Sequence, residues 1–402
     1  MGKDIVSGLA TVAKSRIVFL IMDGLGGIPN EAGKTELEAA QTPNLDALAL
    51  RSICGLLDPI GAGITPGSGP AHFALFGYDP QENNVGRGLL EGAGIGFPMR
   101  EGDLLVRVNF ASLFPDGTIS DRRAGRIETS ASASICEMLQ RSIKIPHTAV
   151  EVFFAPVREH RALMVLRGGN LSEELAETDP QKTGLAPLPP SPLTTDAESC
   201  ALVMEEIIAQ ARKLLSHEQK VHIPLLRGYA KYRRYPSMQE RYKMRSLAIA
   251  YYPMYRGIAQ LIGMDVATNV ANMDEGMKAL VANFNDYDFF FFHIKETDSR
   301  GEDGNFAAKV ETIERVDRLL PQILDLQPDV LVVTGDHSTP AVLGGHSWHP
   351  VPALLYAKNC RPDMVASFGE RACLGGSMGQ IPMKKLMALA LANAGRLLKF
   401  GA

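Results

Sequence analysis

The sequence predicts an α/β protein in which a doubly wound, mostly parallel sheet is interrupted by an inserted α+β domain. Short unbroken apolar runs at residues 17–22, 289–294 and 330–333 each end in a polar turn. Such runs are typical of strands that are buried on both faces of a parallel sheet. Between about residues 98 and 235, apolar and polar residues alternate instead, which is typical of antiparallel strands. We therefore expect one domain from residues 1–97 and 236–402, and an inserted domain from 98–235.

Composition narrows the class of protein and of ligand. The chain has 402 residues, of which 46% are apolar and 21% are charged, as in ordinary soluble globular proteins. The net charge of −4 gives no general electrostatic reason to expect a nucleic-acid partner. The apolar run at 17–22 is too short to cross a membrane. The five cysteines are scattered and form no CxxC pair, which favours reduced thiols in a cytoplasmic protein over a zinc–thiolate site.

The first part of the chain shows two turns that could carry chemistry. The strand at 17–22 ends at Asp23, which a glycine-rich turn follows. Thr42 and Pro43 are typical of a helix start. In the stretch 61–80, Ser68 lies at a loop-to-helix junction between two glycines. A serine there can bind a phosphate through the helix N-terminus, or it can simply cap the helix, and the sequence leaves both interpretations open.

The later elements follow from changes in periodicity. Four alternating segments lie between residues 102 and 168, and Thr195 with Glu198 resembles a capping box that opens a helix. Residues 223–228 and 245–263 are interpreted as the return to α/β structure. A helix over about 306–320 then separates two of the buried strands. A further strand at 352–356 and a helix at 382–398 are expected to complete the chain.

Residue types that ligate metals gather just after the predicted strands. Four of the nine histidines lie between residues 286 and 352, beside several carboxylates. In open α/β sheets, chemistry lies past the carboxyl ends of the strands. Carboxylate and imidazole ligands without thiolate suit Mn²⁺, Zn²⁺ or Mg²⁺, and two such ions can activate a serine for phosphoryl transfer. The candidates are Asp23, Ser68, His293, Asp298, Glu302, Asp303, Asp336, His337, His346 and His349.

Six motifs in a fixed order resemble the archaeal-type cofactor-independent phosphoglycerate mutases, which are alkaline phosphatase-like metalloenzymes. They are MDGLGG, TPGSGPAH with FGYDP, DRRAGRI, HIKETD, TGDHSTP and HSWHPVP. The resemblance covers most of the chain and is strongest over 17–97 and 223–352. It implies an alkaline phosphatase-like fold that interconverts 3-phosphoglycerate and 2-phosphoglycerate through a phosphoserine, in glycolysis and gluconeogenesis. It also implies two divalent ions and no 2,3-bisphosphoglycerate, with Mn²⁺ favoured and Mg²⁺, Zn²⁺ or Co²⁺ as alternatives.

The resemblance also assigns roles to individual residues. Ser68 matches the nucleophile and, with Asp23, Asp336 and His337, one metal site, whereas Asp298 and His346 match ligands of the other. Lys295 matches a lysine that contacts the phosphoryl group. Arg122 matches an arginine that holds the substrate. We expect the neighbouring Arg123 and Arg126, and Arg227 of a second basic cluster, to assist it.

Two positions depart from the family pattern. Glu302 stands where many relatives have histidine. Because it lies four residues after Asp298, it shares a helical face with that residue, so we keep it as a metal ligand that favours harder ions. Gly69 stands where an acidic residue is often found, and Asp303 or His349 is the expected replacement.

Other functions remain as alternatives. The same metal core would serve a phosphatase or another phosphoester-transferring enzyme, and a binding protein with a decayed site is a further alternative. The basic clusters of the insertion favour a mutase, which must retain an acid between two transfers, although solvated surface charge is their commoner fate. A homo-oligomer is retained as an alternative to a monomer.

Overall fold

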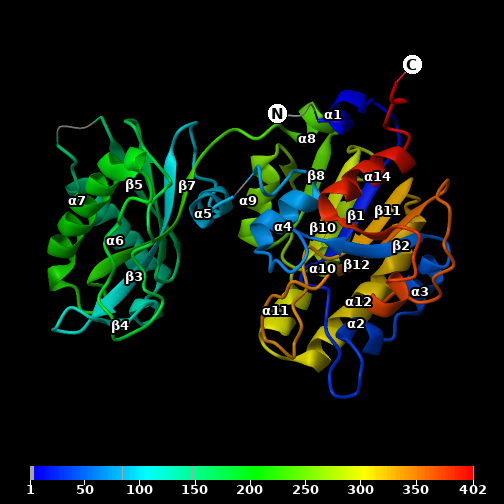
Figure 1. The fold of residues 1–402 in the computed structure, drawn as a ribbon, viewed down its shortest axis with the longest axis horizontal. Coiled ribbons are helices and arrows are strands. Elements are labelled where there is room, and N and C mark those ends of the chain that lie inside the picture. Colours follow the sequence, from blue (N-terminus) through cyan, green and yellow to red (C-terminus); the bar gives the residue numbers. More distant parts are fainter. Residues whose placement is uncertain (1–3, 84, 147–148, 402) are drawn as a thin grey trace. The chain divides into compact units, whose positions relative to one another are not determined.

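The computed structural model describes residues 4–83, 85–146 and 149–401, which form two compact units (Figure 1). One unit comprises Met1–Asn84 with Tyr235–Ala402, and the other comprises Val85–Arg234. The first break therefore falls before the expected boundary at residue 97. The reason is that helix α5 (Arg87–Gly94) packs against strands β3 and β7 of the second unit.

The first unit is built on an eight-stranded sheet with the order β13-β2-β12-β11-β1-β10-β8-β9. Strand β12 runs antiparallel to both of its neighbours, and every other pairing in this sheet is parallel. The strands are β1 (Ile17–Met22), β2 (Ile53–Asp58), β8 (Ser246–Ile249), β9 (Asp265–Val266), β10 (Phe289–Ile294), β11 (Val330–Thr334), β12 (Val351–Ala357) and β13 (Gly379–Pro382). The predicted α/β class with a mostly parallel sheet is confirmed.

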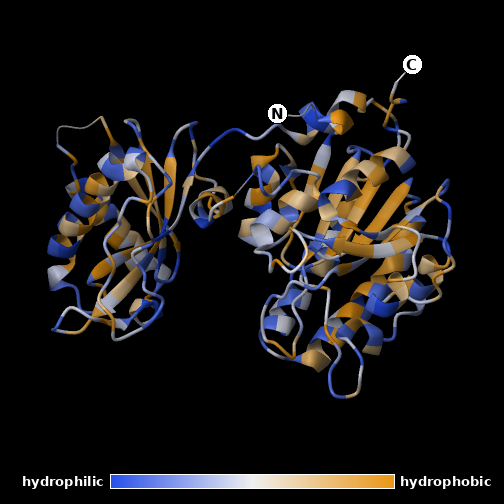
Figure 2. Ribbon diagram, in the orientation of Figure 1, coloured by the Kyte–Doolittle hydropathy of each residue, from blue (hydrophilic) through white to orange (hydrophobic). Residues whose placement is uncertain are grey.

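The centre of this sheet explains the unbroken apolar runs. Strand β1 lies between β11 and β10, and every residue of these three strands is buried. Their ribbons are coloured as hydrophobic in Figure 2. The helices of this unit are α1 (Ile5–Leu9), α2 (Glu36–Ala39), α3 (Pro43–Ala49), α4 (Ser68–Leu75), α8 (Met238–Tyr242), α9 (Pro253–Leu261), α10 (Met273–Asn283), α11 (Glu296–Glu302), α12 (Phe306–Asp325), α13 (Glu370–Cys373) and α14 (Leu386–Asn393).

The second unit has an antiparallel sheet with strand β3 at its centre. Strand β3 (Leu104–Leu113) pairs with β6 (Arg161–Arg167), β7 (Ile223–Lys231) and β4 (Ile119–Asp121), and β6 also pairs with β5 (Glu151–Arg158). Helices α6 (Thr129–Ser142) and α7 (Glu198–Leu214) supply apolar side chains to the main core of this unit. Among the described residues, no helix is both long enough and apolar enough to span a membrane.

Three sequence-based assignments of elements were wrong. Residues 223–228 do not begin the return to α/β structure, because β7 pairs with β3 in the second unit. Thr195 does not cap α7, whose N-cap is Ala197 without a side-chain hydrogen bond. The last helix, α14, spans Leu386–Asn393 and is shorter than the expected range of 382–398. Residues 379–382 form β13 before it, and Gly395 adopts a left-handed backbone conformation just after it.

Candidate metal centre

Loops that follow three adjacent strands carry most of the candidate ligands. Asp23 follows β1, Asp336 and His337 follow β11, and Asp298 lies in α11, which begins after β10. Because β11, β1 and β10 are parallel neighbours, their carboxyl ends meet at one edge of the sheet. All four side chains are fully buried. The sheet topology thus brings together residues that are 313 positions apart in the sequence.

A glycine allows the turn after Asp23 to pass close to the other loops. Gly24 has a φ of +63°, and a Cβ atom there would lie 2.5 Å from Thr339 Oγ1 and 2.7 Å from Asp298 Oδ1. Thr339 Oγ1 itself donates a hydrogen bond to Asp298 Oδ1 at 2.6 Å. Any side chain at position 24 would therefore push apart the three loops that form the site.

Ser68 is the first residue of α4, and Gly67 occupies the N-cap position without a side-chain hydrogen bond. The interpretation of Ser68 as an ordinary helix cap is therefore wrong. Its Oγ lies 3.3 Å from His337 Nε2 instead. The hydroxyl is thus directed at the buried cluster, beside the free N–H groups and positive dipole of the helix N-terminus.

Two groups of side chains have the spacing of a metal site, and His337 belongs to both. Asp23, Asp336 and His337 form one group, in which His337 Nε2 lies 3.1 Å from Asp336 Oδ2 and 3.4 Å from Asp23 Oδ1. Asp298, His337 and His346 form the other, and the two imidazole rings stack at 3.8 Å. His346 Nε2 lies 3.6 Å from Asp298 Oδ1, while its Nδ1 contacts the Pro66 carbonyl at 3.0 Å. With the proton on Nδ1, Nε2 is free to act as a ligand.

Glu302 lies at the edge of the second group. Its Oε1 is 3.7 Å from His346 Nε2, and its side chain is 53% exposed. Asp303 and His349 were expected to supply the acidic or ligand group that Gly69 lacks, but both contact other residues. Asp303 lies 3.7 Å from Arg300, and His349 Nδ1 lies 3.0 Å from Ser347 Oγ. The role of Glu302 as a ligand stays a prediction.

The residues present fit divalent cations. Asp23 Oδ1 and Asp336 Oδ2 are buried and have no hydrogen-bond partner within the described parts of the chain. A buried carboxylate oxygen without a partner is costly, and a cation at this position would satisfy both oxygens. Burial alone would raise the pKa of Asp23, but Lys295, His293 and His337 outweigh it and hold this pKa well below its usual value. The carboxylate is therefore ionised and able to bind metal.

Comparison with known proteins identifies the family. The Metalloenzyme superfamily model matches residues 15–393. A Thermus thermophilus protein named "Probable 2,3-bisphosphoglycerate-independent phosphoglycerate mutase" is 49% identical over 402 residues, which cover 99% of each chain. A Thermotoga maritima protein with the same name is 46% identical over 401 residues, covering 100% of this chain and 99% of that one.

The chain belongs to the 2,3-bisphosphoglycerate-independent phosphoglycerate mutase family of the metalloenzyme superfamily.

Solved structures agree with this assignment. A Pyrococcus horikoshii protein matches with a TM-score of 0.81 and 29% identity, over 97% of this chain and 100% of that one. The cofactor-independent phosphoglycerate mutase from Thermoplasma acidophilum matches with a TM-score of 0.70 and 28% identity, over 95% and 100%. The family resemblance drawn from the motifs is confirmed, and membership of this superfamily implies divalent metal binding.

A lysine lies between the two groups of ligands. Lys295 Nζ contacts Asp298 Oδ2 and lies 3.4 Å from Asp23 Oδ2. Burial would lower the pKa of Lys295, but Asp23 and Asp298 raise it, so the ammonium group remains charged. A charged donor here is well suited to an anionic phosphoryl group. That role for Lys295, which the family resemblance implies, stays a prediction.

Two buried imidazoles contact the carboxylates of the site, and the sequence patterns did not indicate this role for them. His72 Nδ1 lies 2.8 Å from the Ser68 carbonyl and 3.2 Å from Asp336 Oδ2. His293, a residue we considered only as a candidate ligand, places Nε2 3.1 Å from Asp23 Oδ2. The only available signal for His72 was its position four residues after Ser68, which puts both on one face of α4.

Lys309 links the loops of the site to one another through hydrogen bonds from its ammonium group. Its Nζ donates to the carbonyls of Gly24, Gly26 and Thr339 at 2.9, 3.2 and 2.8 Å, and it lies 3.9 Å from Glu36 Oε2. The side chain is fully buried. One ammonium group thus links the loop that carries Asp23 to the loop that carries His337.

We expect Lys309→Met to destabilise the protein by about 3–5 kcal/mol, because it leaves three carbonyls and the Glu36 carboxylate without their buried cation. The affinity for Mn²⁺ should also fall, because the two loops are no longer held together. Urea unfolding and calorimetric Mn²⁺ titration measure the two effects. Lys278→Met, at an exposed lysine of α10, is the matched control. Unchanged stability and metal affinity would show that Lys309 has no such role.

The structure pairs some predicted substrate-binding arginines with acidic residues. Arg122 makes a two-pronged contact with Asp179, at 2.8 Å from Nε and 2.6 Å from Nη2. Arg227 lies 3.1 Å from Glu177 Oε2 and 3.5 Å from Asp179 Oδ2. Arg122 and Arg227, which lie 105 positions apart in the sequence, thus share one carboxylate. The substrate roles of Arg122, Arg123, Arg126 and Arg227 remain predictions.

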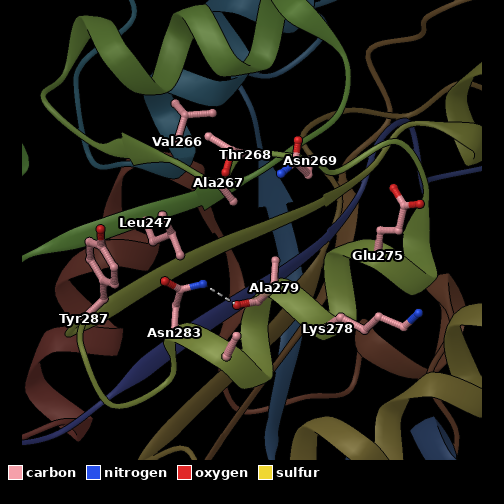
Figure 3. A pocket seen from close by; sticks show the side chains of 11 residues that line it. Leu247, Val266, Ala267, Thr268, Asn269, Glu275, Lys278, Ala279, Asn283 and Tyr287 are labelled. Carbon is pink, nitrogen blue, oxygen red and sulfur yellow. Dashed lines mark hydrogen bonds between the residues drawn. The ribbon is translucent and has the colours of Figure 1, made fainter.

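A groove elsewhere in the first unit contains none of these residues. It has a volume of about 480 Å³ and lies beside α10, with Leu247 of β8 and Val266 of β9 among its lining residues (Figure 3). Asn283 Nδ2 donates to the Ala279 carbonyl at 2.8 Å on the α10 side of the groove. The candidate metal centre therefore does not depend on this groove.

Proposed function

We propose that the chain interconverts 3-phosphoglycerate and 2-phosphoglycerate through a phosphoserine at Ser68, as a step of glycolysis and gluconeogenesis. The observation that carries this proposal is the Ser68 hydroxyl, which does not cap its helix and lies 3.3 Å from His337 Nε2 beside three buried carboxylates. The names of relatives that are 45–49% identical over nearly the whole chain support the same activity.

The transfer is balanced without water and without a second phosphate donor. In the first half, Ser68 Oγ forms a bond to phosphorus, the bond between phosphorus and O3 of the substrate breaks, and O3 ends as a hydroxyl in place of the serine hydroxyl. In the second half, O2 of the retained glycerate forms a bond to phosphorus, the bond between phosphorus and Ser68 Oγ breaks, and the proton from the O2 hydroxyl ends on Ser68 Oγ. The free N–H groups of α4 and the Lys295 ammonium group are the donors beside the phosphoryl group.

Two divalent ions would occupy the two groups of ligands. Asp23, Ser68, Asp336 and His337 would hold one, and Asp298, Glu302 and His346 would hold the other. Such ions supply Lewis-acid stabilisation and lower the pKa of a bound hydroxyl. Mn²⁺ suits this mixture of oxygen and nitrogen ligands best, with Mg²⁺, Zn²⁺ and Co²⁺ as the other options.

We expect Glu302→His to shift the metal preference towards Zn²⁺ or Co²⁺, because a nitrogen ligand then replaces an oxygen beside His346. Calorimetric titration of the metal-free protein with Mn²⁺, Zn²⁺ and Co²⁺ measures the shift. Asp303→His is the control, since Asp303 contacts Arg300 instead. An unchanged order of affinities would mean that Glu302 is not a ligand.

The reaction itself is tested with purified protein, Mn²⁺ and 3-phosphoglycerate, without added bisphosphoglycerate. We expect 2-phosphoglycerate to form with little free phosphate. Free phosphate as the main product would support the phosphatase alternative instead. A cytoplasmic location, the absence of a nucleic-acid or membrane partner and a homo-oligomeric state remain predictions.

A further inference from the structure

The sheet of the second unit carries arginines on the face opposite its main core. Alternate residues of β3, Leu104, Val106, Val108 and Phe110, belong to that core. The intervening residues point to the other face, where Arg107 pairs with Arg227 of β7 and Asn109 pairs with Arg161 of β6. Like charges directly opposite one another destabilise a sheet, so this arrangement needs a reason.

These arginines have too few acidic partners. Arg107 Nε lies 3.4 Å from Glu91 Oε1, and Arg161 Nη1 lies 3.9 Å from the same oxygen, so two guanidinium groups share one carboxylate. Arg227 is already paired with Glu177. For Arg87, whose Cβ lies beside Gly228 on β7, no carboxylate of the described chain comes within ion-pair distance. We call Arg87, Arg107, Arg161 and Asn109 the arginine patch.

Buried polar atoms around the patch also lack partners. Asn109 and His160 are only 6% and 7% exposed. Asn109 Oδ1, His160 Nδ1 and Arg107 Nε accept or donate no hydrogen bond within the part of the chain that the structure describes. Buried polar atoms are nearly always satisfied, and each exception costs stability. A ligand that offers both an anionic group and a hydroxyl would satisfy these atoms.

The electrostatics agree with an excess of positive charge. Burial lowers the pKa of Arg107, and the neighbouring Arg161, Arg87 and Arg227 lower it further, against the opposing effect of Glu91. Burial, with Arg161, Arg123 and Arg107, also lowers the pKa of His160 to about 4, although Glu159 opposes this. His160 is therefore neutral near pH 7 and adds a hydrogen-bonding group to the patch without adding charge.

We propose that the arginine patch binds the carboxylate and hydroxyl of a small hydroxy-acid anion, with Arg107 and Arg161 on the carboxylate and Asn109 on the hydroxyl. The planar guanidinium fork matches a carboxylate, and the amide oxygen accepts from a hydroxyl. The assignment of glycerate as the acid part rests on the proposed function. Solvated surface charge does not explain the patch, because Arg107 and Arg161 are only 18% and 25% exposed at their side chains.

The experiment measures binding by calorimetry to the full Mn²⁺-loaded chain carrying Ser68→Ala, which prevents turnover. The probes are 3-phosphoglycerate, D-glycerate and inorganic phosphate. We expect Arg107→Gln and Arg161→Gln each to lower the affinity for 3-phosphoglycerate and D-glycerate by roughly tenfold to hundredfold, which is the usual effect of losing a charge-assisted contact. The affinity for inorganic phosphate should stay unchanged. Arg141→Gln, at an exposed arginine of α6, should change none of the three affinities.

Folding is followed at the same time through the thermal midpoint, which should not fall, because each change removes mutual repulsion. Arg107→Lys keeps the charge but loses the fork and should show an intermediate loss of affinity. Unchanged binding of both acids in Arg107→Gln and Arg161→Gln would overturn the inference. An equal loss of affinity for inorganic phosphate would also overturn it, because the patch would then be a general phosphate site. A parent protein that binds neither acid would overturn it as well.

The outcome is separable from that of the proposed function. If the chain isomerises 3-phosphoglycerate but the patch variants bind acids normally, only the patch inference fails. If D-glycerate binding depends on Arg107 but the unchanged chain produces no 2-phosphoglycerate, the proposed function fails and the patch remains a hydroxy-acid site.

Discussion

Ser68→Ala is expected to reduce isomerisation to below a few per cent of that of the unchanged protein. The substitution removes the side-chain oxygen that lies 3.3 Å from His337 Nε2, which is the atom that we propose to accept the phosphoryl group. Alanine is a good helix former, and the serine hydroxyl is not used as a cap, so the fold should be retained. Coupled assay of 2-phosphoglycerate formation measures the activity.

The matched control is Ser134→Ala, at an exposed serine of α6 whose hydroxyl bonds only the Ser130 carbonyl. It should leave both activity and thermal midpoint unchanged. A Ser68→Ala protein that is folded, binds 3-phosphoglycerate and still turns over at more than a few per cent of the normal rate would contradict the covalent route.

Removal of metal is expected to inactivate the protein and to lower its thermal midpoint. Without a cation, Asp23 and Asp336 leave buried oxygens unsatisfied and repel one another. An ion present at a hundred times its dissociation constant stabilises the folded state by about 2.7 kcal/mol, which prolonged chelation would remove. Scanning calorimetry and activity should both recover on addition of Mn²⁺.

Asp336→Asn tests the same site without a chelator. It should abolish the stabilisation by Mn²⁺, whereas Asp303→Asn, at the residue that contacts Arg300, should preserve it. Full activity in protein that elemental analysis shows to be free of metal would contradict this part of the account.

The fold and the rough position of the site could be predicted because both depend on local patterns. Fully apolar runs identified the central strands, and the rule that chemistry lies past the carboxyl ends of parallel strands placed Asp23, Asp298 and Asp336 at one edge. The sequence does not distinguish an apolar run in a parallel sheet from one in an antiparallel sheet. For that reason residues 223–228 were interpreted as the return to α/β structure, although the expected domain boundary at 235 places them in the inserted domain, where β7 pairs with β3.

Local sequence patterns do not indicate the contacts that complete the site. Lys309 is a charged residue in a helix whose sequence gives no reason to expect full burial, and its partners lie 30 and 285 positions away. His337 belongs to both groups of ligands and stacks against His346, and no sequence pattern indicates either contact. The pairing of Arg122 with Asp179 likewise joins two loops that only the tertiary fold brings together.

The most direct test of the central claim is to locate the transferred phosphoryl group. The Mn²⁺-loaded protein is mixed with 3-phosphoglycerate, quenched with acid within the first turnovers, digested, and analysed by tandem mass spectrometry. We expect the peptide that contains Ser68 to carry one phosphoryl group, with the modification on Ser68 and absent when Ser68→Ala is used. Phosphate on another residue, or active protein that never carries phosphate at Ser68, would contradict the account.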